Sequence, residues 1–444
     1  MSEPLLAPTS AALLRHVAAV QTASRQPSLI AGVVRDGQLA WWAARGTETG
    51  LADGCDPHPD LQYRIGSIAK PLCAITVLQC RDEGLLDLDD QVDAHLPHAP
   101  FGDSTLRRLL SHSAALPAEP AGPWWERNDA AHLDDLFDRV QAQRPVLDGR
   151  AEHHYSNLGY ALLGAVVAHR RAAPWDVVVA ERVLEPLTMS RTSYLPYDPH
   201  AHGRSVHPYT GRLQPEPHTD TGSMASAGQL WSTLGDLARF AAFLLDPVPV
   251  VLSNASMREM TTVASAPAGD AGGAYGMGLR VEAASTGTRV GHSGSMPGFL
   301  AGVVAEPGAG LAAVAMSNGT VGATPGLAAV LLDEVLAREP AVAPVWQPEP
   351  VVDGADDVVG PWYWGNTPYA IAVRGGRLCL EHADAARSSR FERLDNDHWQ
   401  GLDNYFAGEL LTVQRNERGA VTGLSLATYE FRCAPAADLR SVAP

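Results

Sequence analysis

Lysine is almost absent from this chain of 444 residues. Of its 33 basic residues, 32 are arginine, and the single lysine is Lys70. Arginine replaces lysine on a solvated surface at little cost, but it cannot replace a neutral amine that gives and takes a proton. The composition therefore singles out Lys70 as a candidate for proton-transfer chemistry.

Cysteine and long apolar runs are also scarce. The five cysteines (Cys55, Cys73, Cys80, Cys379 and Cys433) contain no CxxC pair, which is typical of free thiols in a reducing compartment. No apolar run approaches the roughly 18 residues that a membrane-spanning helix needs. The first 30 residues do not combine a basic start with a long apolar stretch. We therefore expect no secretory signal and a cytoplasmic location.

Basic residues are fewer than acidic residues in this chain. The chain has 50 acidic and 33 basic residues and a net charge of −17, which argues against a nucleic-acid partner and against docking on anionic membranes. Apolar residues make up 45% and charged residues 19%, as in ordinary globular proteins. The length predicts two or three domains.

The predicted elements indicate one α/β (α+β) domain over residues 1–340. Residues 9–25 and 324–338 predict helices, and residues 29–45 predict a β-hairpin that turns at Asp36-Gly37. Strands from both chain ends, flanked by the first and last helix, indicate one sheet with a helical insertion. Further helices are expected over residues 67–83, 104–112, 130–143, 157–171 and 233–246.

The residue composition and the pattern of apolar residues change after residue 340. Residues 341–361 are rich in proline and acidic residues, which indicates a linker. Residues 362–444 show short alternating runs separated by Gly, Asn and Asp turns, and this pattern predicts a small antiparallel β-barrel.

The motif Ser67-Ile68-Ala69-Lys70 places a hydroxyl and the single amine on one helical face. Pro71 is tolerated only in the first helical turn, so Ser67 is expected near the N-terminus of the helix. A neutral amine beside a serine is a general base for a nucleophile, provided that burial lowers the amine pKa. The alternative is an N-cap serine with an exposed lysine.

Tyr155-Ser156-Asn157 precedes a predicted helix. Tyr155 can relay protons to a leaving group. The Asn157 amide can hold Lys70 on one side and a substrate carbonyl on the other. The alternative is a buried tyrosine, with Asn157 as the helix N-cap.

His292-Ser293-Gly294 ends a predicted strand. Gly294 would let a substrate backbone lie close to this strand, with Ser293 beside it. The backbone amides of Ser295 and Ser67 can form a pair of donors for an oxyanion. The alternative is a histidine on an edge strand, followed by a turn.

The order and spacing of these three motifs resembles the penicillin-recognising serine enzymes: class C β-lactamases, D-Ala-D-Ala carboxypeptidases, D-aminopeptidases and family VIII esterases. The resemblance covers roughly residues 10–340 and implies a β-lactamase/transpeptidase-like sandwich of antiparallel sheet and helices. Further matching stretches are residues 109–113, 116–117, 155–164, 227–228, 232–233 with Asp236, 275–278 and 292–299.

The resemblance implies a role for each motif residue. Ser67 would be the nucleophile that becomes acylated and Lys70 its base. Tyr155 would be the proton shuttle, Asn157 a polar clamp, and the Ser67 and Ser295 amides the oxyanion hole. His292 stands where many relatives have lysine. A neutral histidine attracts a substrate carboxylate less strongly, which argues against β-lactamase activity.

The C-terminal unit resembles the lipocalin-like barrel of certain D-peptidases and of penicillin-binding-protein-type thioesterases, which release and cyclise nonribosomal peptides. We interpret Trp362, Tyr363, Trp364 and Trp399 as barrel core. An alternative gives the barrel a role in catalysis, in which an arginine such as Arg390 or Arg415 closes over the active site and holds substrate.

We therefore expect a serine acyl-transfer enzyme that needs no metal or organic cofactor. His200, His202 and His207 are interpreted as loop residues because their spacing fits a metal site poorly. The expected partner is a small peptide or acyl-ester substrate, including a nonribosomal peptide on a carrier protein. With water as the second nucleophile the enzyme is an esterase, D-aminopeptidase or carboxypeptidase, and with an amine of the same substrate it is a peptide cyclase. A catalytically silent peptide sensor is the remaining alternative.

Overall fold

The computed structural model describes residues 5–47, 57–128, 132–146, 153–267, 273–284, 286–340 and 347–436. Backbone contacts divide the chain into two compact units, Met1–Ala341 and Val342–Pro444. Within the described residues, no helix is long and apolar enough to cross a membrane. Cys73, Cys80, Cys379 and Cys433 are free thiols, as expected. The fifth cysteine, Cys55, lies outside the described residues.

An antiparallel sheet forms the centre of the first unit, and its strands come from both ends of that unit. Among the described residues it has seven strands in the order β2-β1-β11-β10-β9-β8-β7. The N-terminal hairpin therefore pairs with a strand from the far end of the unit, as the sequence predicted. The strands are β1 (Leu29–Arg35), β2 (Gln38–Arg45), β7 (Ala274–Tyr275), β8 (Arg280–Ala284), β9 (Gly287–Met296), β10 (Phe299–Glu306) and β11 (Leu311–Ser317).

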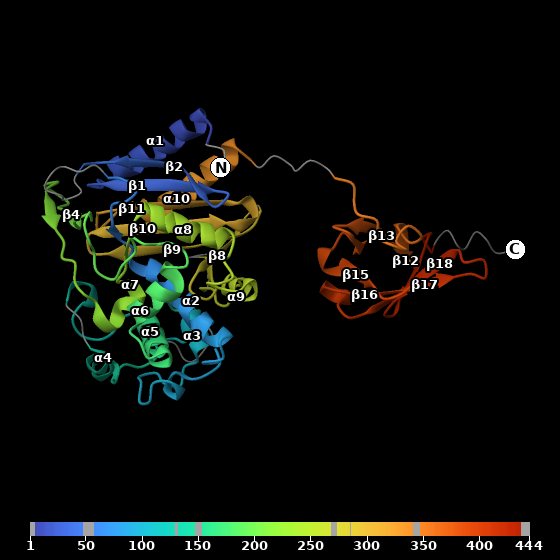
Figure 1. The fold of residues 1–444 in the computed structure, drawn as a ribbon, viewed down its shortest axis with the longest axis horizontal. Helices are drawn as coiled ribbons and strands as arrows, with labels where there is room; N and C mark the ends of the chain where they lie inside the picture. Colours follow the sequence, from blue (N-terminus) through green and yellow to red (C-terminus); the bar gives the residue numbers. More distant parts are fainter. Residues whose placement is uncertain are drawn as a thin grey trace. The chain divides into compact units, whose positions relative to one another are not determined.

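Helices cover both faces of this sheet (Figure 1). On one face, α1 (Ala7–Ala23) and α10 (Thr324–Arg338) bury their apolar sides with Leu29, Ala31 and Val33. On the other face lies α8 (Leu234–Leu245), in a core that includes Ile30 and Val34. The alternating side chains of one buried strand thus contribute to two cores, because successive residues point to opposite faces.

The chain between β2 and β7 is a predominantly helical insertion, and the predicted helices occur within it. Residues 67–83 differ from expectation, because Ser67 lies in a 3-10 turn (Gly66–Ile68) and the α-helix starts only at Ala69. The helices are α2 (Ala69–Asp82), α3 (Leu106–Leu110), α4 (Leu133–Val140), α5 (Asn157–Arg171), α6 (Trp175–Val179), α7 (Ala225–Gly228) and α9 (Asn254–Met260). Two small antiparallel pairs join β3 (Tyr63–Arg64) to β6 (Trp231–Ser232) and β4 (Arg204–Val206) to β5 (Leu213–Pro215).

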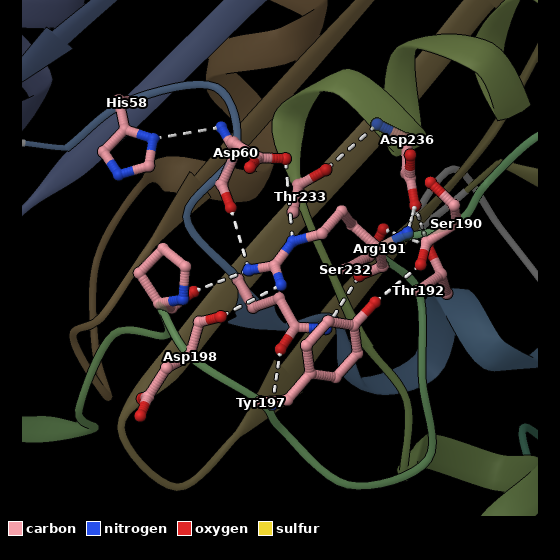
Figure 2. A network of polar contacts seen from close by, with 12 residues as sticks. His58, Asp60, Ser190, Arg191, Thr192, Tyr197, Asp198, Ser232, Thr233 and Asp236 are labelled. Atoms are coloured by element: carbon pink, nitrogen blue, oxygen red, sulfur yellow. Dashed lines mark hydrogen bonds and ion pairs between the residues drawn. The ribbon is translucent and has the colours of Figure 1, made fainter.

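A polar network fixes the start of α8 and the neighbouring β6 (Figure 2). The Thr233 side chain caps α8 by accepting the Asp236 N–H at 3.2 Å. The buried Asp236 carboxylate accepts the Arg191 backbone N–H at 2.8 Å and the Thr192 hydroxyl at 2.9 Å. Because β6 pairs with β3, and β3 leads directly into the turn that carries Ser67, this network supports the segment around Ser67.

The second unit contains a closed antiparallel barrel of eight strands within residues 347–436. Ala355 and Val358, in the segment interpreted as linker, are buried in its core. The strands are β12 (Gly360–Trp364), β13 (Thr367–Arg374), β14 (Arg377–Glu381), β15 (Ser389–Arg393), β16 (His398–Gly401), β17 (Leu410–Arg415), β18 (Val421–Leu426) and β19 (Tyr429–Arg432). This architecture agrees with the expected lipocalin-like barrel.

The barrel aromatics are only partly core residues. Trp362 and Trp399 are buried, as expected. The prediction is wrong for Trp364, which is 41% exposed and packs at a tilt against Tyr429, and Tyr363 is only half-buried. Strand alternation explains Tyr363, because neighbouring residues of β12 point to opposite sides of the barrel wall. Trp364 shares the side of Trp362, but it is the last residue of β12 and is exposed at the end of the strand.

Both arginines considered for substrate binding form ion pairs within the barrel. Arg390 pairs with Asp403 at 2.5 Å. Arg415 pairs with Asp397 at 2.6 Å and with Asp357 at 3.0 Å. A substrate carboxylate would have to compete with these acids for either guanidinium.

Candidate active site

The Ser67 hydroxyl and the Lys70 amine are in direct contact. Lys70 Nζ lies 2.8 Å from Ser67 Oγ. The 3-10 turn and the first turn of α2 are continuous, so residues three apart still share a face. Lys70 is fully buried whereas Ser67 is partly accessible. The interpretation of Ser67 as a helix cap with an exposed lysine is therefore wrong.

Three oxygen atoms surround the Lys70 amine. Besides Ser67 Oγ, they are Asn157 Oδ1 at 2.7 Å and the Ala227 carbonyl at 2.8 Å. Burial lowers the pKa of Lys70 from 10.5 to about 7, and nearby Glu119 and Glu126 oppose this fall. The amine is thus available in its neutral form near neutral pH, where it can accept a proton from Ser67.

Asn157 is the first residue of α5, and it does not cap this helix. Ser156 is the N-cap, and its Oγ accepts the Gly159 N–H at 3.0 Å. This leaves the Asn157 amide free to bridge two other groups: its Oδ1 accepts from Lys70 and its Nδ2 donates to Glu119 Oε1 at 2.6 Å. The structure brings Asn157 to Lys70, as the sequence predicted.

Tyr155 lies over the Lys70 amine, 4.9 Å from Nζ to the ring centroid. Burial raises the pKa of the Tyr155 phenol well above its usual value, although a hydrogen bond with Ser67 opposes the rise. Tyr155 is therefore protonated at neutral pH, which suits a proton donor. The buried His112 ring packs against it, with centroids 4.2 Å apart.

His292 is a neutral side chain on an interior strand of the sheet, and both of its ring nitrogens form hydrogen bonds. It belongs to β9, between β10 and β8, so the alternative of an edge-strand histidine is wrong. Burial lowers the pKa of His292 to about 3, and the Lys70 charge adds to this shift. Its Nδ1 donates to the Ser293 carbonyl at 2.6 Å, and its Nε2 accepts from the Tyr275 hydroxyl at 2.9 Å. His292 thus provides no permanent positive charge.

Two glycines allow the Ser67 turn to pack directly on β9. A Cβ on Gly294 would lie 1.8 Å from the Ile65 carbonyl oxygen, and a Cβ on Gly66 would lie 2.6 Å from the Ser295 amide nitrogen. Gly66 also has a φ of +53°, in the left-handed region that favours glycine. Gly294 is therefore required by the protein's own backbone, a reason that the sequence did not reveal. Its contact with a substrate backbone stays a prediction.

A cavity of about 380 Å³ opens beside Ser67. Besides Ser67, its lining includes Tyr155, His292, Ser293, Gly294 and Ser295. The structure thus brings these predicted residues to one site. Lys70 contacts Ser67, and Asn157 contacts Lys70.

Arg280 and Glu119 are two charged residues at the site that the motifs did not reveal. Arg280 lines the cavity from β8 and is exposed. Within the described part of the chain no acidic side chain pairs with it, and its charge lowers the pKa values of His292 and Tyr155. Neither residue belongs to a recognisable motif, and only the fold brings them to Ser67.

Of the three histidines interpreted as loop residues, two lie next to each other. His200 and His202 have ring centroids 5.2 Å apart, and His200 packs on Trp231. His207 lies apart from them, next to Tyr209. Across the described ranges, no group of three or more His, Cys, Asp or Glu residues is arranged to hold a metal ion.

The comparison with protein families assigns the first unit. A model described as Beta-lactamase matches residues 13–337. The chain belongs to the β-lactamase family. The family and its structural neighbours are serine hydrolases of the β-lactamase and penicillin-binding-protein type. A second model, for a domain of unknown function (DUF7586), matches residues 351–432 of the barrel unit.

Proteins with similar sequences match only part of this chain. Beta-lactamase-like protein 2 of Dictyostelium discoideum is 28% identical over 250 residues, which is 52% of this chain and 45% of the relative. PbpX of Bacillus subtilis is 26% identical over 245 residues, 54% of this chain and 58% of PbpX. The chain thus spans about half the length of these relatives.

Solved structures share the fold over more of the chain. The octameric penicillin-binding protein homologue from Pyrococcus abyssi has a TM-score of 0.65 at 20% identity, covering 95% of this chain and 99% of the homologue. SurE has a TM-score of 0.60 at 22% identity, covering 96% and 99%. The D-stereospecific amidohydrolase from Streptomyces sp. has a TM-score of 0.61 at 24% identity, covering 75% and 99%.

Proposed function

We propose that this serine hydrolase transfers acyl groups of peptidyl esters, thioesters or D-residue-containing peptides through an acyl-enzyme on Ser67. The contact between Ser67 Oγ and the buried, readily neutral Lys70 amine carries the proposal. A hydroxyl next to such a base is an activated nucleophile. The same contact speaks against a silent sensor, because a site that only binds needs no base.

Each side chain has one task in the proposed reaction. Lys70 accepts the Ser67 proton as the oxygen attacks the substrate carbonyl, and the Ser67 and Ser295 amides stabilise the oxyanion. Tyr155 protonates the leaving group and recovers its proton from Lys70. An ester on Ser67 remains. A second nucleophile then attacks this ester, and its proton returns to the Ser67 oxygen through the same groups.

The family comparison and the barrel support a peptidyl substrate. One similar structure is named a D-stereospecific amidohydrolase, and another is SurE with D-Leu, which covers 96% of this chain at a TM-score of 0.59. The barrel after the catalytic unit is the arrangement of the thioesterases and D-peptidases that the sequence resembles. We therefore favour release and cyclisation of a nonribosomal peptide, delivered free or on a carrier protein. A cytoplasmic location agrees with this role and stays a prediction that cell fractionation would test.

A second candidate, hydrolysis of D-residue peptides that end in a free carboxylate, is favoured by Arg280. This guanidinium lines the cavity beside Ser67 and has no acidic partner among the described residues. A carboxylate of the leaving residue could pair with it, because guanidinium binds carboxylate in a planar, two-point geometry. Such a pair would replace the lysine that relatives carry at the position of His292.

Mass spectrometry of the products would separate these functions. Wild type would be mixed with peptidyl thioesters ending in an L- or a D-residue, and with matched peptides ending in a free carboxylate. A product lighter than the linear acid by one water means cyclisation, and linear acid alone means hydrolysis. No turnover of any peptide would contradict the peptidyl proposal and leave simple esters as substrates.

Arg280→Gln is the matched variant for this experiment. For carboxylate-ended peptides we expect about a tenfold loss of kcat/KM, the effect of one charge-assisted hydrogen bond. Thioester turnover would stay unchanged. An equal loss with both substrates would contradict the proposed carboxylate contact.

A further inference from the structure

We propose that Glu119 is a positioning residue for the Lys70 base and acts through the side chain of Asn157. Glu119 lies in the loop between α3 and the turn Trp125–Arg127. The inference rests on the proposed role of Lys70 as base, and it assigns the group that holds this base ready.

The Asn157 amide has one donor end and one acceptor end, and Glu119 decides which end faces Lys70. Asn157 Nδ2 donates to Glu119 Oε1 at 2.6 Å, while Asn157 Oδ1 accepts from Lys70 Nζ at 2.7 Å. A carboxylate accepts hydrogen bonds and cannot donate them. The amide oxygen must therefore point to Lys70. The reversed amide would place its NH₂ group against the Lys70 amine.

Glu119 is itself held in place from two sides. Its Oε2 accepts the Trp125 indole N–H at 2.6 Å, and Trp125 is 7% exposed. The preceding Ala118 carbonyl accepts the Asn157 backbone N–H at 2.8 Å. A continuous series of hydrogen bonds thus leads from Trp125 through Glu119, Asn157 and Lys70 to Ser67.

Glu119 also contributes a negative charge near Lys70, and a second carboxylate separates this effect from positioning. Glu126 likewise raises the pKa of Lys70, but its carboxylate accepts the Trp124 indole N–H at 2.9 Å and forms no hydrogen bond with Asn157 within the described residues. Loss of either charge lowers the pKa of Lys70. The other titratable groups around Lys70 are Cys73 of α2, Tyr155 and Tyr160 at α5, His112 after α3 and His292 of β9.

The single lysine makes the test direct. Protein labelled with ¹³Cε-lysine should give one lysine resonance, whose titration reports the pKa of Lys70. We would record it for wild type, Glu119→Gln and Glu126→Gln, together with the acylation rate by p-nitrophenyl acetate on the high-pH plateau. In both variants we expect the titration to move to lower pH. Only Glu119→Gln should lose plateau rate, by about 10- to 100-fold, because it misplaces the base.

Trp125→Phe supplies an independent variant that keeps the Glu119 charge. It removes one hydrogen bond to Glu119, so the plateau rate should fall by less than in Glu119→Gln and the titration should not move downward. A wild-type plateau rate in Glu119→Gln would overturn the inference, as would an equal loss in Glu126→Gln or an unshifted titration in Glu119→Gln.

The design also separates this inference from the proposed function. Absence of peptide turnover contradicts the proposed substrate but leaves the ester comparison intact. Absence of any acylation of wild type contradicts the Ser67 acyl-enzyme, while the lysine titration, which needs no turnover, still tests the effect of Glu119.

Discussion

At the residue scale, Lys70 has a property that the 32 arginines of the chain lack. Its amine loses a proton near neutral pH once it is buried, whereas a guanidinium stays charged. The full burial of Lys70 and its three oxygen neighbours supply this environment. The unusual composition of the sequence therefore agrees with the chemistry of the site.

We predict that kcat/KM for an activated ester falls as the pH drops through about 7. The pKa of Lys70 is about 7, and below that pH the amine is protonated and cannot accept the Ser67 proton. The pH–rate profile of wild type measures this directly. A rate that stays flat down to pH 5 would contradict a role for Lys70 as base.

Lys70→Arg is the matched variant for this profile. Its guanidinium stays protonated and cannot act as the general base, so we expect a loss of about 10²- to 10⁴-fold. Circular dichroism would check that the larger side chain is accommodated in the fold.

The residues found only in the structure show what motif spacing cannot predict. Ser67 and Lys70 are three residues apart, and a helical turn alone brings them together. Glu119 meets Asn157 across 38 residues, and Arg280 reaches the cavity through the register of β8 against β9. Such contacts depend on tertiary packing, for which a single sequence carries no local signal.

At the element scale, the site depends on how closely the Ser67 turn lies against β9. Many elements of the first unit were predictable, because apolar periodicity and turn residues mark β1, β2, α5 and α10. The 3-10 turn at Ser67 and the interior place of β9 were not. The interior place of β9 results from its pairing with both β8 and β10. The turn lies against β9 through the close backbone approach at Gly66 and Gly294, which is a property of two elements together.

We predict that Gly294→Ala lowers acylation by about 100-fold. Its Cβ would lie 1.8 Å from the Ile65 carbonyl oxygen, so β9 must move away from the turn and carry the Ser295 amide with it. Acylation kinetics with an activated ester measure the loss. Gly326→Ala in α10 is the control, because its Cβ meets nothing within 4 Å. Equal rates for the two variants would contradict this role of Gly294.

At the scale of the whole molecule, the chain has two units, each with its own hydrophobic core. The barrel core contains Trp362, Trp399 and Leu424, all buried, and it includes no residue from the described part of the first unit. Separate cores predict separate unfolding transitions, because each unit loses its own buried surface.

We predict that Leu424→Ala destabilises the barrel by about 2–5 kcal/mol and leaves hydrolysis of a small ester unchanged. Leu424 is fully buried in β18. Scanning calorimetry should show one transition shifted and one retained. Val351→Ala serves as a control because Val351 is 87% exposed. Loss of ester hydrolysis in parallel with the barrel transition would contradict independent units.

The central claim is that Ser67 becomes covalently acylated. Intact-mass spectrometry of wild type and Ser67→Ala, each mixed with a slowly turned-over activated ester, tests it most directly. We predict one acyl group per wild-type chain, located on the peptide that contains Ser67, and none on Ser67→Ala. An adduct of equal size on both proteins, or turnover by Ser67→Ala at the wild-type rate, would contradict the claim.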